Sequence, residues 1–305
     1  MHNPDSVEQI TRQENIERQF NRKHIDGYIK KELEALPEME AKIEQGVELL
    51  VQYMNQDYYE SKNARIAQLQ GMDLHSLVLS IYMGVAYCVH PELFTSVTAQ
   101  LASRLKMSDK VAAIQTIAEI LAVLCNTDVF DINKAGRDAS LKVISRIPLS
   151  ASLVSYIENS QYLPPMVCRP LPLENNYSSG YLTHNDSLIL GSGNHHEGDI
   201  CRDVLHLMNQ VPLRLDTEFL STFEEQPTFD LETQEQRELW DRYKRQSYDF
   251  YLLLAQYGNQ FYLTHKVDKR GRIYAQGYHV TTQGTAFKKA SIELAQEEII
   301  NGVPT

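Results

Sequence analysis

A recurring apolar stripe near the start of the chain constrains the fold more than any other sequence feature. Met39, Ile43, Val47, Leu50 and Met54 follow one another at spacings of four, four, three and four residues. This spacing places the five side chains on one face of a single helix. The stripe therefore predicts a helix that buries this face against other elements.

More helices are predicted on both sides of this one. Pro37 separates it from an earlier amphipathic helix, and proline is a common helix breaker. The apolar face of that earlier helix consists of Ile25, Ile29, Leu33 and Leu36. Further helical segments are predicted at about residues 73–89, 95–106, 109–125 and 137–158. The first half of the chain thus reads as a helical platform.

Several features indicate a cytoplasmic protein without a membrane segment. The apolar run at 77–89 is interrupted and too short to cross a bilayer of about 30 Å, so we interpret it as a buried helix. Residues 1–20 contain early acids and no continuous apolar run, unlike a signal or transit peptide. No CxxC pair occurs among the four cysteines, which fits reduced thiols: Cys88, Cys125, Cys168 and Cys201.

The character of the sequence changes at residues 162–182. Four prolines fall within nine residues, and proline fixes φ and removes a backbone donor, so this segment is expected to be extended and irregular: Pro164, Pro165, Pro170 and Pro172. Short strands are then predicted at 186–191 and 260–267, with a helix at about 197–210 and amphipathic segments up to Tyr257 between them. The predicted fold class is mainly α with a small β component.

The last predicted helix spans residues 284–298. Thr285 is a plausible N-cap, and Phe287 and Leu294 are expected on the inner face of this helix.

A short basic loop stands out because the chain as a whole is acidic. The formal net charge is −11, yet residues 266–289 contain six Lys and Arg residues and the single acid Asp268, a local charge of +5. Half of these cations lie in the stretch DKRGRIY, residues 268–274. Binding surfaces are local, so a cationic loop can contact nucleic acid on an acidic protein.

Each residue type in this loop suits contact with a nucleic-acid backbone. Gly271 allows a sharp turn or a close approach, and the planar guanidinium of Arg272 matches phosphate oxygens. Asp268, four residues before Arg272, can orient that guanidinium, and Tyr274 can pack on a base or sugar. A solvated turn with a surface ion pair is the alternative interpretation.

The same region resembles a known family of polymerases. FYLTHKVDKRGRIYA (261–275), followed by Gln283-Gly284 and FKKASIELAQ (287–296), resembles the DxxGR region of phage-type and mitochondrial-type single-subunit RNA polymerases. PPMVCRPLPLENNYSSGYL (164–182) and MNQVPLRLDTEFL (208–220) resemble two further blocks of that family, in the same order. Arg214 takes the basic position of the second of these blocks, whereas Leu213 and Asp216 depart from its pattern.

The resemblance implies an arrangement of domains along the chain. A helical N-terminal domain and a proline-rich segment with a helix are followed by short thumb-like helices and by the first strand, loop and helix of a polymerase palm. The expected bounds are 1–160, 161–220, 221–259 and 260–305.

The resemblance also implies that this chain does not polymerise alone. The family's two metal-binding aspartates and its triphosphate-binding helix have no counterpart here, and Glu293, Glu297 and Glu298 match no metal motif of the family. Either the sequence is a fragment, or the enzyme is divided and a second subunit supplies the remaining palm and the fingers. Two-subunit polymerases of Enquatro-type phages are divided in this way, and the chain resembles their smaller subunit. Mg²⁺ would then be bound by the partner.

The expected role is to hold template DNA or the RNA–DNA hybrid, with no catalytic or metal-binding residue in this chain. A single-stranded-DNA or melting factor is a further expected partner, and the expected location is the cytoplasm of an infected bacterial host. A non-catalytic helical scaffold or regulatory protein that binds nucleic acid is the alternative. The expected nucleic-acid-binding residues are Lys266, Asp268, Lys269, Arg270, Gly271, Arg272, Tyr274 and Arg214.

A metal site is a competing hypothesis for residues 195–206. His195, His196, Cys201 and His206 are all possible ligands. However, neither His195 nor His196 is spaced from His206 as a helical i, i+4 pair, so a surface turn before a helix is the preferred interpretation.

Overall fold

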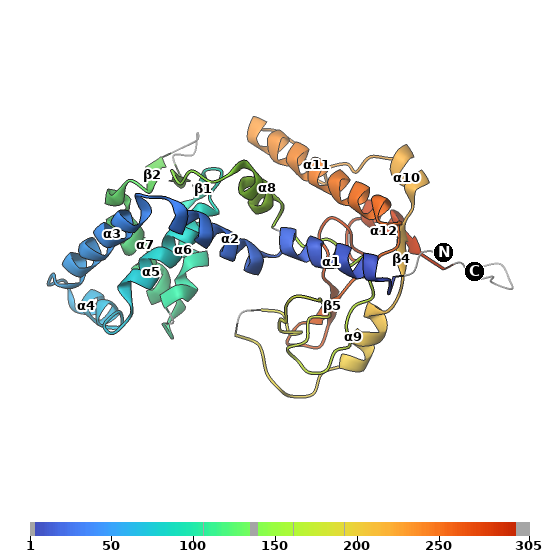
Figure 1. The fold of residues 1–305 in the computed structure, drawn as a ribbon, viewed down its shortest axis with the longest axis horizontal. Coiled ribbons are helices and arrows are strands. Elements are labelled where there is room, and N and C mark those ends of the chain that lie inside the picture. The colour runs from blue at the N-terminus through green and yellow to red at the C-terminus, as the bar shows by residue number, and fades with distance from the viewer. Residues whose placement is uncertain (1–3, 106, 135–139, 161, 192, 297–305) are drawn as a thin grey trace. The chain divides into compact units, whose positions relative to one another are not determined.

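The computed structural model describes residues 4–105, 107–134, 140–160, 162–191 and 193–296. These residues form two compact units (Figure 1). One unit comprises Arg22–Glu158, and the other joins Met1–Asn21 to Asn159–Thr305. Helices are the main regular structure of the described residues and the sheets are small, so the predicted fold class of mainly α with a small β component is confirmed.

The unit Arg22–Glu158 is built around a helical core. Its helices are α2 (Arg22–Ala35), α3 (Met39–Met54), α4 (Glu60–Ala67), α5 (Leu74–Ala86), α6 (Phe94–Leu101), α7 (Lys110–Leu124) and α8 (Ala151–Asn159), the last residue of α8 lying in the other unit. The predicted stripes are confirmed, because fully or almost fully buried side chains recur along them: Ile25, Ile29 and Leu33 on α2, and Met39, Ile43 and Leu50 on α3.

Helix α7 and the turn after it, Lys110–Thr127, are long and apolar enough to cross a membrane by length and composition alone. A core helix passes the same test. Ile117, Ile120, Leu121 and Leu124 of α7 are completely buried in the hydrophobic core of this unit. We therefore interpret α7 as a core helix.

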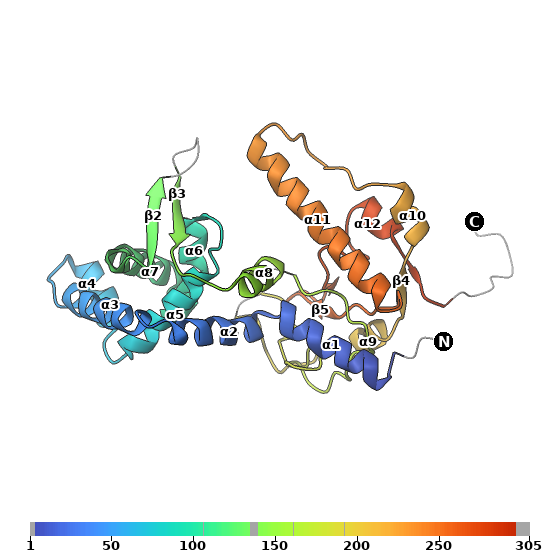
Figure 2. The same ribbon diagram turned by 45° about the horizontal axis from the view of Figure 1, so that its top comes forward.

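The predicted helix at 137–158 is partly wrong. Residues 141–145 form the strand β3 (Leu141–Ser145), which pairs antiparallel with β2 (Phe130–Lys134) and with β1 (Glu92–Leu93). Figure 2 shows β2 and β3 side by side. Only the end of the expected helix forms, as α8. The strand depends on pairing with residues about ten positions earlier, which helical periodicity does not report.

The second unit contains fewer helices and more irregular backbone. Its described elements are α1 (Val7–Phe20), α9 (Arg202–Asn209), α10 (Thr217–Thr222), α11 (Gln234–Gln256), α12 (Ala286–Ala290), β4 (Leu213–Leu215), β5 (His265–Val267), β6 (Ile273–Ala275) and β7 (Ile292–Leu294). The long helix α11 is drawn in orange in Figure 1 and occupies the segment expected to be thumb-like.

The segment 260–267 connects most of this unit. Phe261 bridges Leu213, Tyr262 bridges Met166 of the proline-rich segment, and Val267 bridges Ile189. Phe261, Tyr262 and Val267 are buried. The backbone that leads into the basic loop is therefore held by three segments distant in sequence.

The last predicted helix in this unit differs from the structure. The expected helix at 284–298 is only the five residues of α12, followed by β7, which pairs antiparallel with β4. Thr285 is its N-cap as predicted, since its hydroxyl accepts from the backbone N–H of Lys288, but Leu294 is 57% exposed and lies on the strand. Glu297 and Glu298 lie outside the described residues.

The expected strand at 186–191 and helix at 197–210 are shorter than predicted. The first is a single parallel bridge at Ile189, and the second begins at Arg202.

Along the chain, the two units meet between Glu158 and Asn159. The described residues 4–21 belong with the C-terminal unit and not with the helical platform. The physical reason is a polar stripe on α1, because Gln9, Gln13 and Glu17 are all buried there. The Gln13 side-chain oxygen accepts from the backbone N–H of Val167 at 2.9 Å, which ties α1 to the proline-rich segment.

Candidate nucleic-acid interface

The basic loop forms the tip of the hairpin β5–β6. The strands pair antiparallel, with His265 opposite Ala275 and Val267 opposite Ile273. At the tip, the N–H of Gly271 donates to the carbonyl oxygen of Asp268 at 2.9 Å, and Gly271 has φ +79°. This matches the common three-residue hairpin loop, in which a turn is followed by a left-handed residue. The positive φ favours glycine at this position. Lack of space does not, because a Cβ there would meet no atom within 4 Å.

The Asp268 carboxylate fixes the conformation of the loop. Its Oδ1 accepts from the backbone N–H groups of Arg270 (2.8 Å) and Arg272 (3.0 Å). Its Oδ2 accepts from Nε of Arg272 at 2.7 Å and lies 2.7 Å from Nη2 of the same guanidinium. The predicted ion pair between Asp268 and Arg272 is therefore present. Nη1 of Arg272 keeps donors for a ligand, because a guanidinium carries five N–H groups.

The pKa of Asp268 reflects this arrangement. Partial desolvation acts to raise it, but hydrogen bonds from the backbone and the guanidinium of Arg272 lower the pKa below its usual value. The hydrogen bond to Asp268 in turn raises the pKa of Arg272. Both groups are charged over the whole physiological pH range, so the loop geometry does not depend on pH there.

The cations at the tip are open to solvent. The side chains of Arg270 and Arg272 are 64% and 54% exposed, and Lys269 is exposed as well. The Arg272 guanidinium lies 5.7 Å from the centre of the Tyr274 ring, within the range of a cation–π contact. The tip thus presents three cations and one aromatic ring over a single turn.

The remaining predicted cations do not join this surface. Lys266 forms an ion pair with Asp186 at 2.6 Å, and its side chain is only 15% exposed. Arg214 lies on β4, in another sheet, and pairs with Glu293 of β7 at 2.7 Å. Lys288 is buried. The local charge of +5 in the sequence is therefore divided among several places in the fold.

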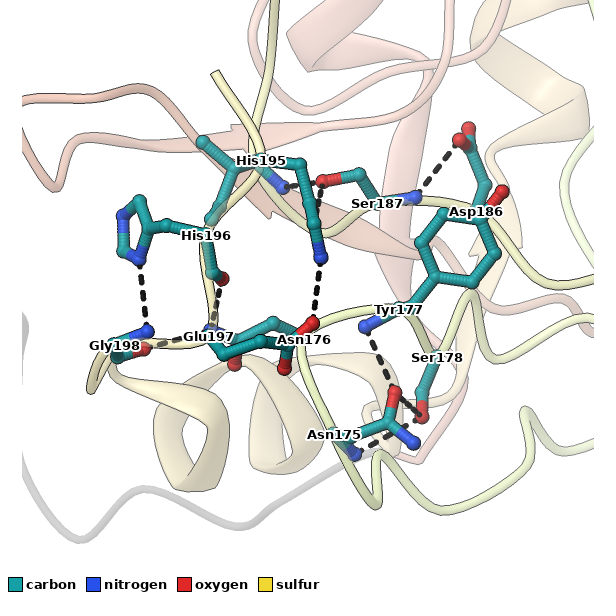
Figure 3. A network of polar contacts seen from close by, with 11 residues as sticks. Asn175, Asn176, Tyr177, Ser178, Asp186, Ser187, His195, His196, Glu197 and Gly198 are labelled. Carbon is teal, nitrogen blue, oxygen red and sulfur yellow. Dashed lines mark hydrogen bonds and ion pairs between the residues drawn. The ribbon is translucent and has the colours of Figure 1, made fainter. Parts of the chain in front are cut away.

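A network of polar contacts supports the outer side of β5. The N–H of Leu190 donates to the carbonyl of Val267, and the N–H of Val267 donates to the carbonyl of Leu188. The buried amide of Asn176 donates to the carbonyl oxygens of His196 (2.8 Å) and Gly198 (2.7 Å), which holds the neighbouring loop in place (Figure 3).

The histidines of this loop form hydrogen bonds within the same polar network. His195 contacts the Ser187 hydroxyl through Nδ1 (2.9 Å) and the Glu197 carboxylate through Nε2 (2.7 Å) (Figure 3). His196 Nδ1 accepts from the N–H of Gly198. Within the described part of the chain, no three His, Cys, Asp or Glu side chains gather where they could hold a metal ion.

Sequence reasoning missed the residues that position the hairpin. Asn176, Asp186 and Glu17 each anchor backbone or side chains that lie far away in sequence. A signal existed only for Glu17, because Gln9, Gln13 and Glu17 recur every four residues on a helix with a single fully buried apolar residue, Ile16. A helix with such a polar stripe needs a polar partner.

The chain is similar to a curated protein, the "Probable DNA-directed RNA polymerase" of Gelasinospora sp. (strain G114). The two are 28% identical over 147 residues, which cover 43% of this chain and 17% of the relative. The chain therefore spans less than one fifth of the length of the relative. No protein-family model matches the chain. The similarity supports a relation to DNA-directed RNA polymerases.

Proposed function

We propose that this chain is a subunit of a divided, phage-type DNA-directed RNA polymerase. It supplies the N-terminal scaffold, the thumb-like helix and the hairpin β5–β6, which grips the backbone of the template strand or of the RNA–DNA hybrid. A second subunit supplies the rest of the palm, the fingers and the catalytic aspartates. Phosphate contacts of this kind position nucleic acid without reading its sequence.

The observation that carries the proposal is the carboxylate-locked tip. Asp268 holds Arg270 and Arg272 in one exposed turn, so little conformational entropy is lost when their guanidinium groups bind phosphate. The similarity to a probable DNA-directed RNA polymerase supports the same assignment.

Nucleotide transfer in such an enzyme uses Mg²⁺ to stabilise the attacking and leaving oxygens. The described residues of this chain do not fit such a site, because no three metal-ligating side chains gather among them. The proposal therefore places the metal in the partner. It also includes a melting factor for initiation on duplex DNA and a location in the cytoplasm of an infected bacterial host.

Reconstitution tests the divided enzyme. The chain is mixed with a candidate second chain that carries the catalytic motifs, and RNA synthesis is measured on single-stranded or pre-opened template. We expect transcripts from the mixture and none from either chain alone. RNA synthesis by this chain alone contradicts the proposal. A monodisperse monomer that binds nucleic acid, and that copurifies with no polymerase-like chain, favours the scaffold alternative.

Arg272→Ala tests the tip itself. We expect weaker retention of an RNA–DNA hybrid. The slope of log K against the logarithm of the salt concentration should be smaller in magnitude by about 0.7 to 0.9, the value of one lost phosphate contact. The measurement is the fluorescence anisotropy of a labelled hybrid over a range of salt concentrations. Folding of the chain should be unchanged, because the side chain of Arg272 is 54% exposed.

Arg146→Ala is the matched control. Arg146 also pairs with an aspartate, Asp131, through Nε at 2.7 Å, and its side chain is 52% exposed, but it lies in the other unit. Its removal should leave the salt dependence unchanged. Equal salt slopes for wild type and Arg272→Ala would contradict the proposed phosphate contact of the hairpin.

A further inference from the structure

A cavity of about 270 Å³ lies within the C-terminal unit, beside the first half of α11. Its size is close to the lower end of small-molecule sites, about 300 Å³. Aromatic side chains of α11, of the loop before it and of the loop after β6 form much of its wall: Phe229, Trp240, Tyr243 and Tyr278. Phe229 is 58% exposed, so the cavity has an apolar rim that is open to solvent.

The floor of the cavity carries a buried cation. Lys288 is only 8% exposed, and its ammonium donates to the carbonyl oxygen of Tyr278 at 2.6 Å. The same ammonium lies 4.6 Å from the centre of the Tyr278 ring and 5.2 Å from that of Tyr243. An ammonium has three donors, and the recorded hydrogen bond uses one of them. Burial lowers the pKa of Lys288, which reflects the lack of solvent around it.

Polar side chains complete the wall in a fixed geometry. The Glu225 carboxylate accepts from the Tyr243 hydroxyl at 2.5 Å and from the Thr285 hydroxyl at 3.1 Å, so it ties the loop before α11 to α11 and α12. Gln236 accepts two backbone N–H groups through Oε1, which leaves its NH₂ group as a donor toward a ligand. The cavity is therefore preformed.

We propose that this cavity binds an unstacked nucleobase of a single-stranded nucleic acid. The flat base stacks against the aromatic wall, and its ring nitrogens and carbonyl oxygens accept hydrogen bonds from Lys288 and Gln236. Stacking on aromatic side chains is the usual way in which proteins bind single strands without sequence preference. The inference rests on the proposed function only in taking nucleic acid as the ligand.

An apolar side chain of a protein partner suits the cavity less well. It would cover the aromatic wall but would offer no acceptor to the Lys288 ammonium, whose hydrogen bond to the carbonyl oxygen of Tyr278 leaves donors that a base can use. A base supplies an apolar face and acceptors in one rigid ligand. Its phosphates remain outside, next to solvent.

The position of the chain's single tryptophan provides a direct test. Trp240 lines the cavity, so its fluorescence reports occupation without a label. The full chain is titrated with adenosine, with a short single-stranded DNA oligonucleotide and with an abasic oligonucleotide of the same length. We expect saturable quenching by adenosine and by the base-containing strand, and none by the abasic strand.

Variants place the ligand in the cavity. Phe229→Ala and Lys288→Met should each weaken quenching by the base-containing strand about tenfold, the effect of losing roughly 1.4 kcal/mol of a stacking or hydrogen-bond contact. Leu252→Ala is the control, since Leu252 is 59% exposed on the same helix and does not line the cavity. Thermal unfolding followed by Trp240 fluorescence identifies any variant that fails to fold.

The outcomes separate this inference from the proposed function. Arg272→Ala should change the salt dependence of hybrid binding and leave quenching by adenosine unchanged. Equal quenching by abasic and base-containing strands, or no quenching by either, overturns the base pocket. If adenosine quenches Trp240 but Arg272→Ala does not change hybrid binding, the base pocket is supported and the role of the hairpin is contradicted.

Discussion

Glu17→Ala is expected to lower the free energy of unfolding of the C-terminal unit by about 3–5 kcal/mol. The Glu17 carboxylate is fully buried and accepts from the backbone N–H groups of Leu182 (2.9 Å) and Thr183 (2.7 Å). It also accepts from the Thr183 hydroxyl at 2.6 Å and from the Gln13 amide at 2.9 Å. Each buried donor left without an acceptor costs about 1–3 kcal/mol, and the alanine variant leaves several.

Denaturant unfolding followed by Trp240 fluorescence measures this effect, because Trp240 belongs to the same unit as Glu17. Glu17→Gln should cost less, since it keeps the shape and one acceptor oxygen. Glu14→Ala is the matched control on the same helix. Its side chain is 40% exposed and pairs with the neighbouring Arg18 on the helix surface, so a change within about 0.5 kcal/mol is expected. Equal effects at positions 14 and 17 would show that the buried stripe does not hold the unit together.

The same contact should make the unit sensitive to strong acid. Burial acts to raise the pKa of Glu17, but hydrogen bonds from His184, Thr183, Leu182 and Gln13 outweigh it and leave the pKa lowered. The unfolded state therefore binds a proton more readily than the folded state. The stabilisation is present above the unfolded pKa of about 4.5 and is lost as the pH falls through the folded value.

His279 is expected to produce the second large effect, a loss of about 3 kcal/mol of stability between pH 6.5 and pH 4. The ring is 2% exposed, and burial, with a smaller contribution from the charge of Lys288, lowers its pKa to about 4. The unfolded histidine takes up a proton near pH 6.5, whereas the folded one stays neutral until about pH 4. The stabilisation is thus complete above pH 6.5. It falls by about 1.36 kcal/mol for each pH unit between the unfolded pKa and the folded pKa.

The measurement is the unfolding free energy of the full chain at a series of pH values from 4 to 7, with Trp240 as the reporter. His279→Gln should flatten this pH dependence, because glutamine can keep a hydrogen bond with the Ser247 hydroxyl, which lies 2.7 Å from Nδ1 of His279. His196→Gln, at an exposed position of the same unit, is the control. The Glu17 contribution sets in mainly below pH 4.5. Burial also lowers the pKa of His265 in the same unit, so the difference between wild type and His279→Gln, and not the whole pH dependence, measures the His279 contribution. A steep pH dependence that persists in His279→Gln would assign it to another group.

Glu17 and Gln13 connect the stability of the unit to the candidate interface. Glu17 holds the backbone at residues 182 and 183, and Gln13 holds that of Val167, next to the residue that bridges Tyr262. Tyr262 lies in the segment that leads into β5. A variant that loosens α1 is therefore expected to weaken hybrid retention even though it leaves the hairpin tip intact.

Local sequence patterns were sufficient for features that form within a few residues. The spacing of Met39, Ile43 and Leu50 fixes a helical face, because an α-helix brings residues three and four apart to the same side. Asp268 and Arg272 pair because a tight turn brings them together, and Thr285 caps α12 through a donor three residues away. Each of these predictions involves atoms whose separation is limited by the intervening chain.

Only the tertiary structure decided the features that depend on distant partners. Residues 141–145 and 292–294 are strands because β2 and β4 lie beside them. Arg214 is held in an ion pair because β7 brings Glu293 opposite it. The charge of Lys288 reads as part of a basic patch in the sequence, yet in the fold it lies at the cavity, beside the ring of Tyr243 and the carbonyl oxygen of Tyr278. Composition counts charges along the chain, whereas burial and pairing depend on which segments meet in space. The sequence therefore determined the helical platform and the locked hairpin tip, and tertiary packing determined which cations remain available to a ligand.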